Sequence, residues 1–149
     1  MSHVTDRRTF LKGAVLTGAG VWLGTEGAQA QSKSPNDKLN IAVVGVGGRG
    51  GANLGAVAGE NIVALCDVDE NTLAGAAQRF PKAQKYNDYR KMLEQKNIDA
   101  VVVSTPDHMH APIAANAIRR GKHVYCEKPL THTVHEARFL RELALEHRV

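Results

Sequence analysis

The chain has 149 residues, a formal net charge of +4 and hydrophobic residues at 43% of its positions. Its basic residues are scattered and are not interleaved with aromatic side chains, which argues against a nucleic-acid partner. From Lys38 onward 112 residues remain, enough for one domain with a hydrophobic core but too few for two.

Residues 1–30 are expected to be an export signal. The pair Arg7-Arg8 precedes a mildly apolar run over residues 13–24, and Ala28-Gln29-Ala30 has the small-x-small pattern of a cleavage site. The segment resembles a twin-arginine signal peptide, which implies the twin-arginine export machinery as a partner and a periplasmic or otherwise exported location. A membrane anchor is disfavoured, because a spanning helix needs about 20 apolar residues. Residues 31–37 predict a polar linker.

A G-x-G-x-x-G motif follows the first predicted strand of the domain, residues 39–44, and precedes a predicted helix over residues 51–58. Such a turn lets backbone N–H groups and a helix N-terminus approach a pyrophosphate, because side chains would obstruct that approach. An ordinary tight turn is the alternative. Arg49 is expected to add a charge-assisted contact, or else to face solvent. The predicted phosphate-binding residues are Gly45, Gly47, Gly48, Arg49 and Gly50.

A second apolar run, residues 62–66, ends in Asp67, 22 residues after Gly45. A dinucleotide site needs an acid at about this distance to accept hydrogen bonds from the adenosine ribose. An anionic side chain would repel the extra phosphate of NADP, so Asp67 favours NAD as the cofactor. The alternative is an aspartate that caps a helix or stabilises a turn.

The rest of the chain alternates between short β-branched runs and helical stretches, which predicts an α/β fold with a doubly wound parallel (Rossmann) sheet over residues 38–149. A sheet of this type normally continues with another strand, so the chain is expected to be truncated before a second domain. The remaining predicted strands cover residues 84–86, 99–104 and 123–126, and the predicted helices cover residues 70–80, 87–95, 107–120 and 134–147.

Helix caps are expected from Asp69, from Asn87 and from the capping box of Thr133 and Glu136. The two cysteines, Cys66 and Cys126, fall at the ends of strands that the usual strand order separates by two others. They are therefore expected to be free thiols.

Ligands bind beyond the carboxyl ends of parallel strands, and polar residues gather there in this chain. His108 and His110 favour a cofactor cleft over a metal site, because no further ligands complete a set; packing or surface roles are the alternative. Lys128 is a candidate to move a substrate hydroxyl proton as hydride leaves, although a structural Glu–Lys pair is equally compatible. The residues after the fourth and fifth predicted strands are Thr105, Pro106, His108, His110, Glu127 and Lys128.

The strand-GxGxxG-helix opening, the aspartate after the second strand, the segment STPDHMH (104–110) and the segment GKHVYCEKPL (121–130) together resemble the nucleotide-binding half of the Gfo/Idh/MocA oxidoreductases. The resemblance implies NAD as cofactor, a sugar or polyol substrate, a second α/β domain and a homo-oligomeric full-length form. Gly45, Gly47, Gly50 and Asp67 would then bind the cofactor. Thr105, Pro106 and His110 would line its nicotinamide side, with Glu127 and Lys128 near the nicotinamide ribose and the substrate.

Two alternatives stay open at this point. Exported relatives include NAD-dependent glycoside hydrolases, but that group lacks the lysine of the Glu-Lys-Pro element, so Lys128 favours the oxidoreductase. The second alternative is that a truncated gene yields a dinucleotide-binding fragment without catalytic activity. Catalysis by these residues alone is not expected, whereas cofactor binding is.

Overall fold

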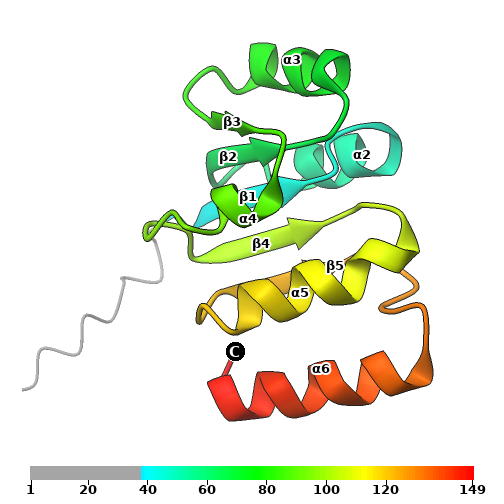
Figure 1. Ribbon diagram of the computed structural model, residues 1–149. Helices are drawn as coiled ribbons and strands as arrows, with labels where there is room; N and C mark the ends of the chain where they lie inside the picture. Colours follow the sequence, from blue (N-terminus) through cyan, green and yellow to red (C-terminus); the bar gives the residue numbers. More distant parts are fainter. Residues whose placement is uncertain (1–37) are drawn as a thin grey trace, which may run out of the picture. The chain divides into compact units, whose positions relative to one another are not determined.

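Strands and helices alternate along residues 38–149, the part of the chain that the computed structural model describes (Figure 1). The expected export signal and linker lie outside these residues and stay predictions. The strands are β1 (Asn40–Val44), β2 (Asn61–Cys66), β3 (Gln84–Tyr86), β4 (Ala100–Val103) and β5 (His123–Cys126). The helices are α2 (Gly48–Ala56), α3 (Glu70–Arg79), α4 (Tyr89–Met92), the 3-10 helix η1 (Asp107–Met109), α5 (His110–Ile118) and α6 (Val134–His147).

The five strands form one parallel sheet in the order β3-β2-β1-β4-β5. Strand order reverses at β1, because the chain first adds β2 and β3 on one side and then β4 and β5 on the other. Strands β1 and β4 are almost entirely buried apolar residues, as a strand covered on both faces requires. The predicted doubly wound fold is confirmed, and the point of reversal is where such sheets bind ligands.

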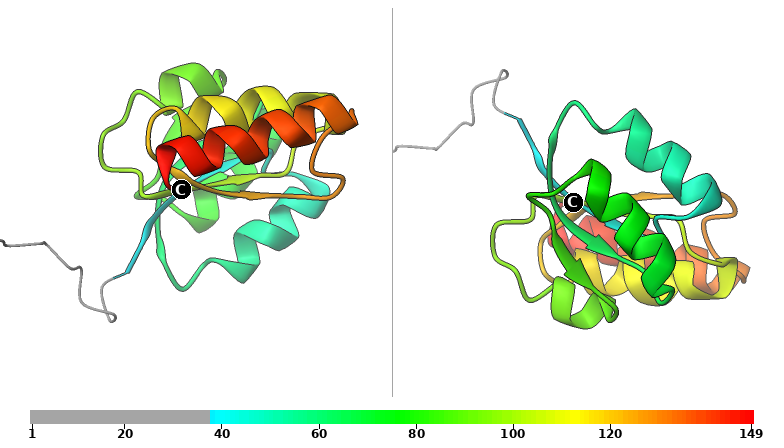
Figure 2. Two further views of the ribbon diagram at one scale, coloured as in Figure 1. Left: turned by 90° about the horizontal axis from the view of Figure 1, so that it is seen from below. Right: turned by 90° about the horizontal axis from the view of Figure 1, so that it is seen from above.

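Helices cover both faces of the sheet (Figures 1 and 2). On one face Leu54 of α2 and Leu73 of α3 pack against Val43 and Leu65. On the other face α4 and α5 pack against the alternate residues of the same strands, with Met92 and Ile113 fully buried. Helix α6 lies beside α5 rather than against the sheet centre, and the two helices bury a small cluster of their own. The central strands are therefore rigidly enclosed, and their carboxyl ends are fixed relative to one another.

Helix α2 begins at Gly48, three residues before the predicted start at Gly51. The second half of the glycine motif is thus already the first turn of the helix. Gly47 is its N-cap and contributes no side-chain hydrogen bond, so the first N–H groups of α2 have no side-chain cap. A helix that starts inside the motif places its positive end closer to the strand than the sequence predicted.

The helix predicted over residues 87–95 is a single turn, and its cap is Asp88 rather than Asn87. Asp88 accepts a hydrogen bond from the backbone N–H of Arg90. The Asn87 side chain turns the other way and donates to the backbone oxygen of Asp67. The prediction of Asn87 as the cap was wrong, because the sequence could not show that this amide is used by the neighbouring strand end.

The helix predicted over residues 107–120 is divided into η1 and α5. Pro112 explains the division, because it has no N–H to donate to the carbonyl four residues earlier. A helix starting at His110 keeps Pro112 within its first turn, where that N–H is not needed. Helix α5 ends before Gly121, as expected. Gly121 has a φ of 67°, and the N–H of Lys122 donates to the oxygen of Ala117 at 3.1 Å.

The other predicted caps are confirmed. Asp69 accepts from the N–H of Asn71 at the start of α3, and Thr133 and Glu136 form a reciprocal capping box at the start of α6. Cys66 and Cys126 are free, and burial raises the pKa of their thiols to about 12 and about 11. Within residues 38–149 no helix is both long enough and apolar enough to cross a membrane.

Candidate functional site

A cavity of about 540 Å³ opens at the carboxyl ends of β1, β2 and β4. Its walls come from the glycine turn, from the segment after β2, from α4 and from the segment after β4. The lining residues are Val44, Gly45, Gly47, Cys66, Asp67, Val68, Asp69, Thr72, Tyr89, Ser104, Thr105, Pro106, His108, Met109 and Ile113. Gly48, Arg49, Gly50, His110, Glu127 and Lys128 lie outside this lining.

The glycine turn leaves no room for side chains at three of its positions. A Cβ at Gly45, which has a φ of 80°, would lie 2.6 Å from the carbonyl oxygen of Ser104. A Cβ at Gly50 would lie 1.9 Å from the oxygen of Gly45, and one at Gly47 would lie 2.8 Å from the Thr72 side chain. Gly48 has open space around it but a φ of 49°. The motif is therefore a close contact between the turn, β4 and α3.

Asp67 lies at the cavity wall beside the glycine turn. Its Oδ2 accepts a hydrogen bond from the N–H of Val46 at 2.9 Å, and its Oδ1 accepts one from the N–H of Asp69 at 3.0 Å. Each carboxylate oxygen has a second lone pair, so these bonds leave capacity for ligand hydroxyls. The turn-stabilising interpretation of Asp67 and its predicted ribose role are thus compatible in one geometry.

Thr105, in the segment after β4, lines the cavity and carries a buried hydroxyl. Its Oγ1 has no hydrogen-bond partner in the protein. Buried polar atoms are rarely left unpaired, so an unpaired hydroxyl on a cavity wall indicates a polar ligand. Together with the exposed N-terminus of α2 and the Asp67 carboxylate, the cavity fits a nicotinamide dinucleotide.

The Arg49 side chain pairs with Glu127, which follows β5. Arg49 Nε donates to Glu127 Oε2 at 2.9 Å, and the Asn53 amide donates to the same oxygen at 2.8 Å. These hydrogen bonds, with one from the N–H of Lys128, lower the pKa of Glu127 to about 2. The Glu127 carboxylate is therefore held toward α2. Asn53 was missed by the sequence analysis; its only signal is a polar residue on the otherwise buried side of α2.

The Glu127 carboxylate is expected to make stability depend on acidic pH. Its folded pKa of about 2 lies below the ordinary value of 4.5, so the unfolded chain binds a proton first as the pH falls. The stabilisation is complete above about pH 4.5 and disappears toward pH 2. The melting temperature of the wild type should exceed that of Glu127→Gln at pH 7, and the gap should close between pH 4.5 and 2.

Circular dichroism melts at several pH values measure this gap. Glu146→Gln, which removes an exposed carboxylate from the far helix α6, is the matched control. A gap between wild type and Glu127→Gln that stays constant down to pH 2 would contradict the depressed pKa.

The two candidate histidines have different surroundings. His108 is exposed and lines the cavity. His110 is only 1% exposed, and its ring nitrogens lie 2.6 Å from the carbonyl oxygen of Pro129 and 2.7 Å from that of Thr105. No cluster of three or more His, Cys, Asp or Glu side chains between residues 38 and 149 could hold a metal ion.

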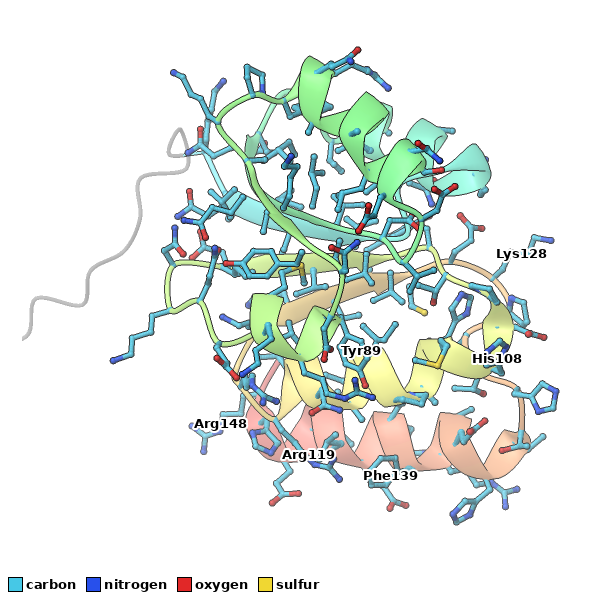
Figure 3. The ribbon with its side chains drawn as sticks, turned by 45° about the horizontal axis from the view of Figure 1, so that its top comes forward. Tyr89, His108, Arg119, Lys128, Phe139 and Arg148 are labelled. Atoms are coloured by element: carbon cyan, nitrogen blue, oxygen red, sulfur yellow. The ribbon has the colours of Figure 1, made fainter. Side chains whose placement is uncertain are left out.

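Lys128 is exposed at the carboxyl end of β5. Figure 3 shows Lys128 and His108 at the same end of the domain, with the lysine pointing away from the ribbon. The predicted site residues thus share one edge of the sheet, but they divide between the cavity and the surface beside it. About half of the predicted binding residues line the cavity, and the others, with the candidate proton-transfer group Lys128, lie outside its lining.

The fold and this edge define a dinucleotide-binding Rossmann domain. The family model described as "Oxidoreductase family, NAD-binding Rossmann fold" (GFO_IDH_MocA) matches residues 39–149. The chain belongs to this family, the Gfo/Idh/MocA oxidoreductases, and comprises its domain for a nicotinamide cofactor.

Similar proteins include a glycosyl hydrolase family 109 protein of Solibacter usitatus, 37% identical over 153 residues, which cover 89% of this chain and 34% of the relative. The inositol 2-dehydrogenase of Rubrobacter xylanophilus is 31% identical over 118 residues, which cover 76% of this chain and 34% of the relative. Among solved structures, GenD2 from gentamicin A biosynthesis in complex with NAD has a TM-score of 0.72 at 32% identity, covering 83% of this chain and 36% of that one. The chain spans about a third of the length of these proteins.

Proposed function

We propose that the domain binds NAD and serves hydride transfer between this cofactor and a sugar or polyol. The observation that carries the proposal is the shared edge of the sheet, where the glycine turn and Asp67 adjoin a cavity and Lys128 stands next to it. Similar proteins named inositol 2-dehydrogenase support a polyol substrate. The structural neighbour in complex with NAD supports the cofactor.

Different residues of this chain would bind the cofactor and accept the substrate proton. The glycine turn and the N-terminus of α2 would bind the pyrophosphate, and Asp67 would accept hydrogen bonds from the adenosine ribose. When bound, NAD would supply the hydride acceptor. Lys128 Nζ would accept the hydroxyl proton of the substrate as the carbinol C–H bond is oxidised to a carbonyl group.

Replacing Asp67 tests the choice of cofactor. Asp67→Ala is expected to weaken NAD binding by roughly ten- to a hundredfold, because hydrogen bonds to a charged acceptor contribute about 1.5–3 kcal/mol. Asp67→Asn keeps an acceptor for the Val46 N–H but removes the charge, so it should narrow the preference for NAD over NADP. Calorimetric titration with both cofactors measures these effects.

Asp88→Asn is the control for Asp67, because Asp88 caps α4 and is not part of the cavity lining. It should leave both affinities unchanged. An NAD affinity of Asp67→Ala equal to that of the wild type would refute the ribose role.

Glycoside hydrolysis through transient oxidation is the second candidate, since a family 109 glycosyl hydrolase is 37% identical to this chain. A full-length protein that acts as a dehydrogenase should accumulate NADH when it is incubated with NAD and a polyol such as inositol. A hydrolase of this type should release sugar from a glycoside with no net NADH. Absorbance at the NADH band, measured beside sugar release, separates the two.

A further inference from the structure

The loop that carries Lys128 is held on both sides by buried polar side chains. The residue before it, Glu127, is bound by Asn53 of α2. The residue after it, Pro129, has its carbonyl oxygen 2.6 Å from a ring nitrogen of His110 in α5. Helices on opposite faces of the sheet thus converge on the two neighbours of one exposed lysine.

On the first side, the Asn53 amide bridges two strand ends. Its Nδ2 donates to Ser104 Oγ after β4 at 2.9 Å and to Glu127 Oε2 after β5 at 2.8 Å. Asn53 is 8% exposed and the Glu127 side chain 12% exposed, so both groups are largely withdrawn from water. The other carboxylate oxygen of Glu127 accepts from the Lys128 N–H at 3.1 Å. The chain of contacts therefore runs from α2 to the backbone of Lys128.

On the second side, the ring of His110 bridges the same two strand ends. One ring nitrogen is 2.7 Å from the carbonyl oxygen of Thr105, after β4, and the other is next to Pro129, after β5. His110 is 1% exposed, and both of its ring nitrogens lie next to protein carbonyl oxygens. Its place along the nicotinamide side stays a prediction, and within the domain its ring joins the two loops.

Asn53 and His110 differ from the other buried polar side chain of the domain in where they lie. The structure buries three polar or charged side chains between residues 38 and 149, namely Asn53, His110 and Lys122. Lys122 donates to the carbonyls of Gln95 and Ile98, at the opposite end of β4. The other two both bridge the segments after β4 and β5. Burying a polar group is costly unless it is hydrogen-bonded, and here both sets of bonds join the loops on either side of the candidate proton-transfer group.

We propose that Asn53 and His110 are positioning residues for Lys128, which they act on through Glu127 and Pro129. The inference rests on the proposed function. A proton acceptor is effective only within hydrogen-bond distance of the substrate hydroxyl, and a displacement of about 1 Å is enough to cost about a hundredfold in rate. An exposed lysine on a free loop would not keep such a distance, whereas a loop fixed to α2 and α5 does.

Exchanging the amide of Asn53 and the carboxylate of Glu127 between the two positions tests the positioning role in the full-length protein. Asn53→Asp alone places two carboxylates together, and Glu127→Gln alone removes the negative charge and leaves one acceptor oxygen where the carboxylate has two. The double variant restores one donor and one acceptor in reversed order, and the Ser104 hydroxyl is able to donate to the new carboxylate. Each single variant should lower kcat about tenfold or more while the Kd for NAD changes less than about threefold, and the double variant should recover most of the loss.

His110→Asn, whose shorter side chain cannot reach both carbonyls, is expected to show the same split between kcat and Kd. Asn116→Ala, on the same helix and outside both loops, is the control and should resemble the wild type. Hydrogen exchange at the Lys128 amide gives a readout independent of turnover. It should speed up in the single exchange variants and slow again in the double variant.

Unchanged kcat in both single variants would overturn the proposal. A parallel loss of kcat and NAD affinity without recovery in the double variant would also overturn it, because that pattern marks a merely structural role. Glu127→Gln covers the case in which Asn53→Asp does not fold, since it replaces the carboxylate with an uncharged amide of nearly the same size. Failure of the proposed function gives a different result, namely full turnover by Lys128→Ala.

Discussion

Gly50→Ala should abolish measurable NAD binding and destabilise the domain by about 3 kcal/mol, the upper end of the usual cost of overpacking. The added methyl group would lie 1.9 Å from the carbonyl oxygen of Gly45 and 2.7 Å from its carbonyl carbon. Both are backbone atoms, so no side-chain rotation relieves the clash. Either α2 must move away from β1 or the turn must open, and each change displaces the N–H groups expected to bind the pyrophosphate.

Gly75→Ala is the matched control, because it makes the same substitution at an exposed position of helix α3. No atom lies within 4 Å of a Cβ at Gly75, and alanine is favoured over glycine by about 1 kcal/mol inside a helix. Gly75→Ala should therefore stabilise the domain slightly and leave NAD affinity unchanged. Chemical denaturation and calorimetric titration measure the two effects. An NAD affinity of Gly50→Ala close to that of the wild type would show that the close packing of this turn is not needed for binding.

Features that depend on local spacing were predictable from the sequence. The strand-turn-helix setting of Gly45–Gly50 and the aspartate after β2 follow from distances along the chain, and in the structure Gly45, Gly47 and Asp67 line one cavity. The sheet follows from the alternation of apolar runs and helices. The caps at Asp69 and Thr133 were also predictable, because a cap binds N–H groups only two or three residues away.

Features that depend on packing between distant segments were not predictable. Asn53 and Glu127 are 74 residues apart, and no local rule says that an amide in α2 will meet a carboxylate after β5. The sequence likewise grouped His108 with His110 as cleft residues, whereas the turn of the helix directs one toward the cavity and the other into the domain. The cap of α4 was misassigned for a related reason, since Asn87 contacts the end of β2.

The residues proposed to bind the cofactor and the residue proposed to transfer the proton lie in different places. Asp67 and the glycine turn adjoin the cavity, while Lys128 stands beside it, fixed by contacts to its neighbours in sequence. Substitutions in the two places should therefore give different kinetic effects. Changes at the cavity should act on cofactor affinity, and changes at Lys128 should act on the chemical step after the cofactor is bound.

Lys128→Ala in the full-length protein should lower kcat by about a hundred- to ten-thousandfold, the usual contribution of a positioned acid or base. The Kd for NAD should change less than about threefold, because the side chain is exposed and lies outside the cavity lining. Steady-state oxidation of a polyol and calorimetric titration with NAD measure the two quantities. Lys91→Ala, which removes an exposed lysine from α4, is the control and should alter neither.

Lys128→Arg distinguishes proton transfer from charge alone. Arginine keeps a positive group near the substrate, but it does not lose its proton in proteins and so cannot accept one. If Lys128 accepts the hydroxyl proton, the arginine variant should be as slow as the alanine variant. If the lysine serves only as a fixed charge, the arginine variant should recover most of the turnover. Equal losses of kcat and NAD affinity in Lys128→Ala would instead assign the lysine to the structure of the loop.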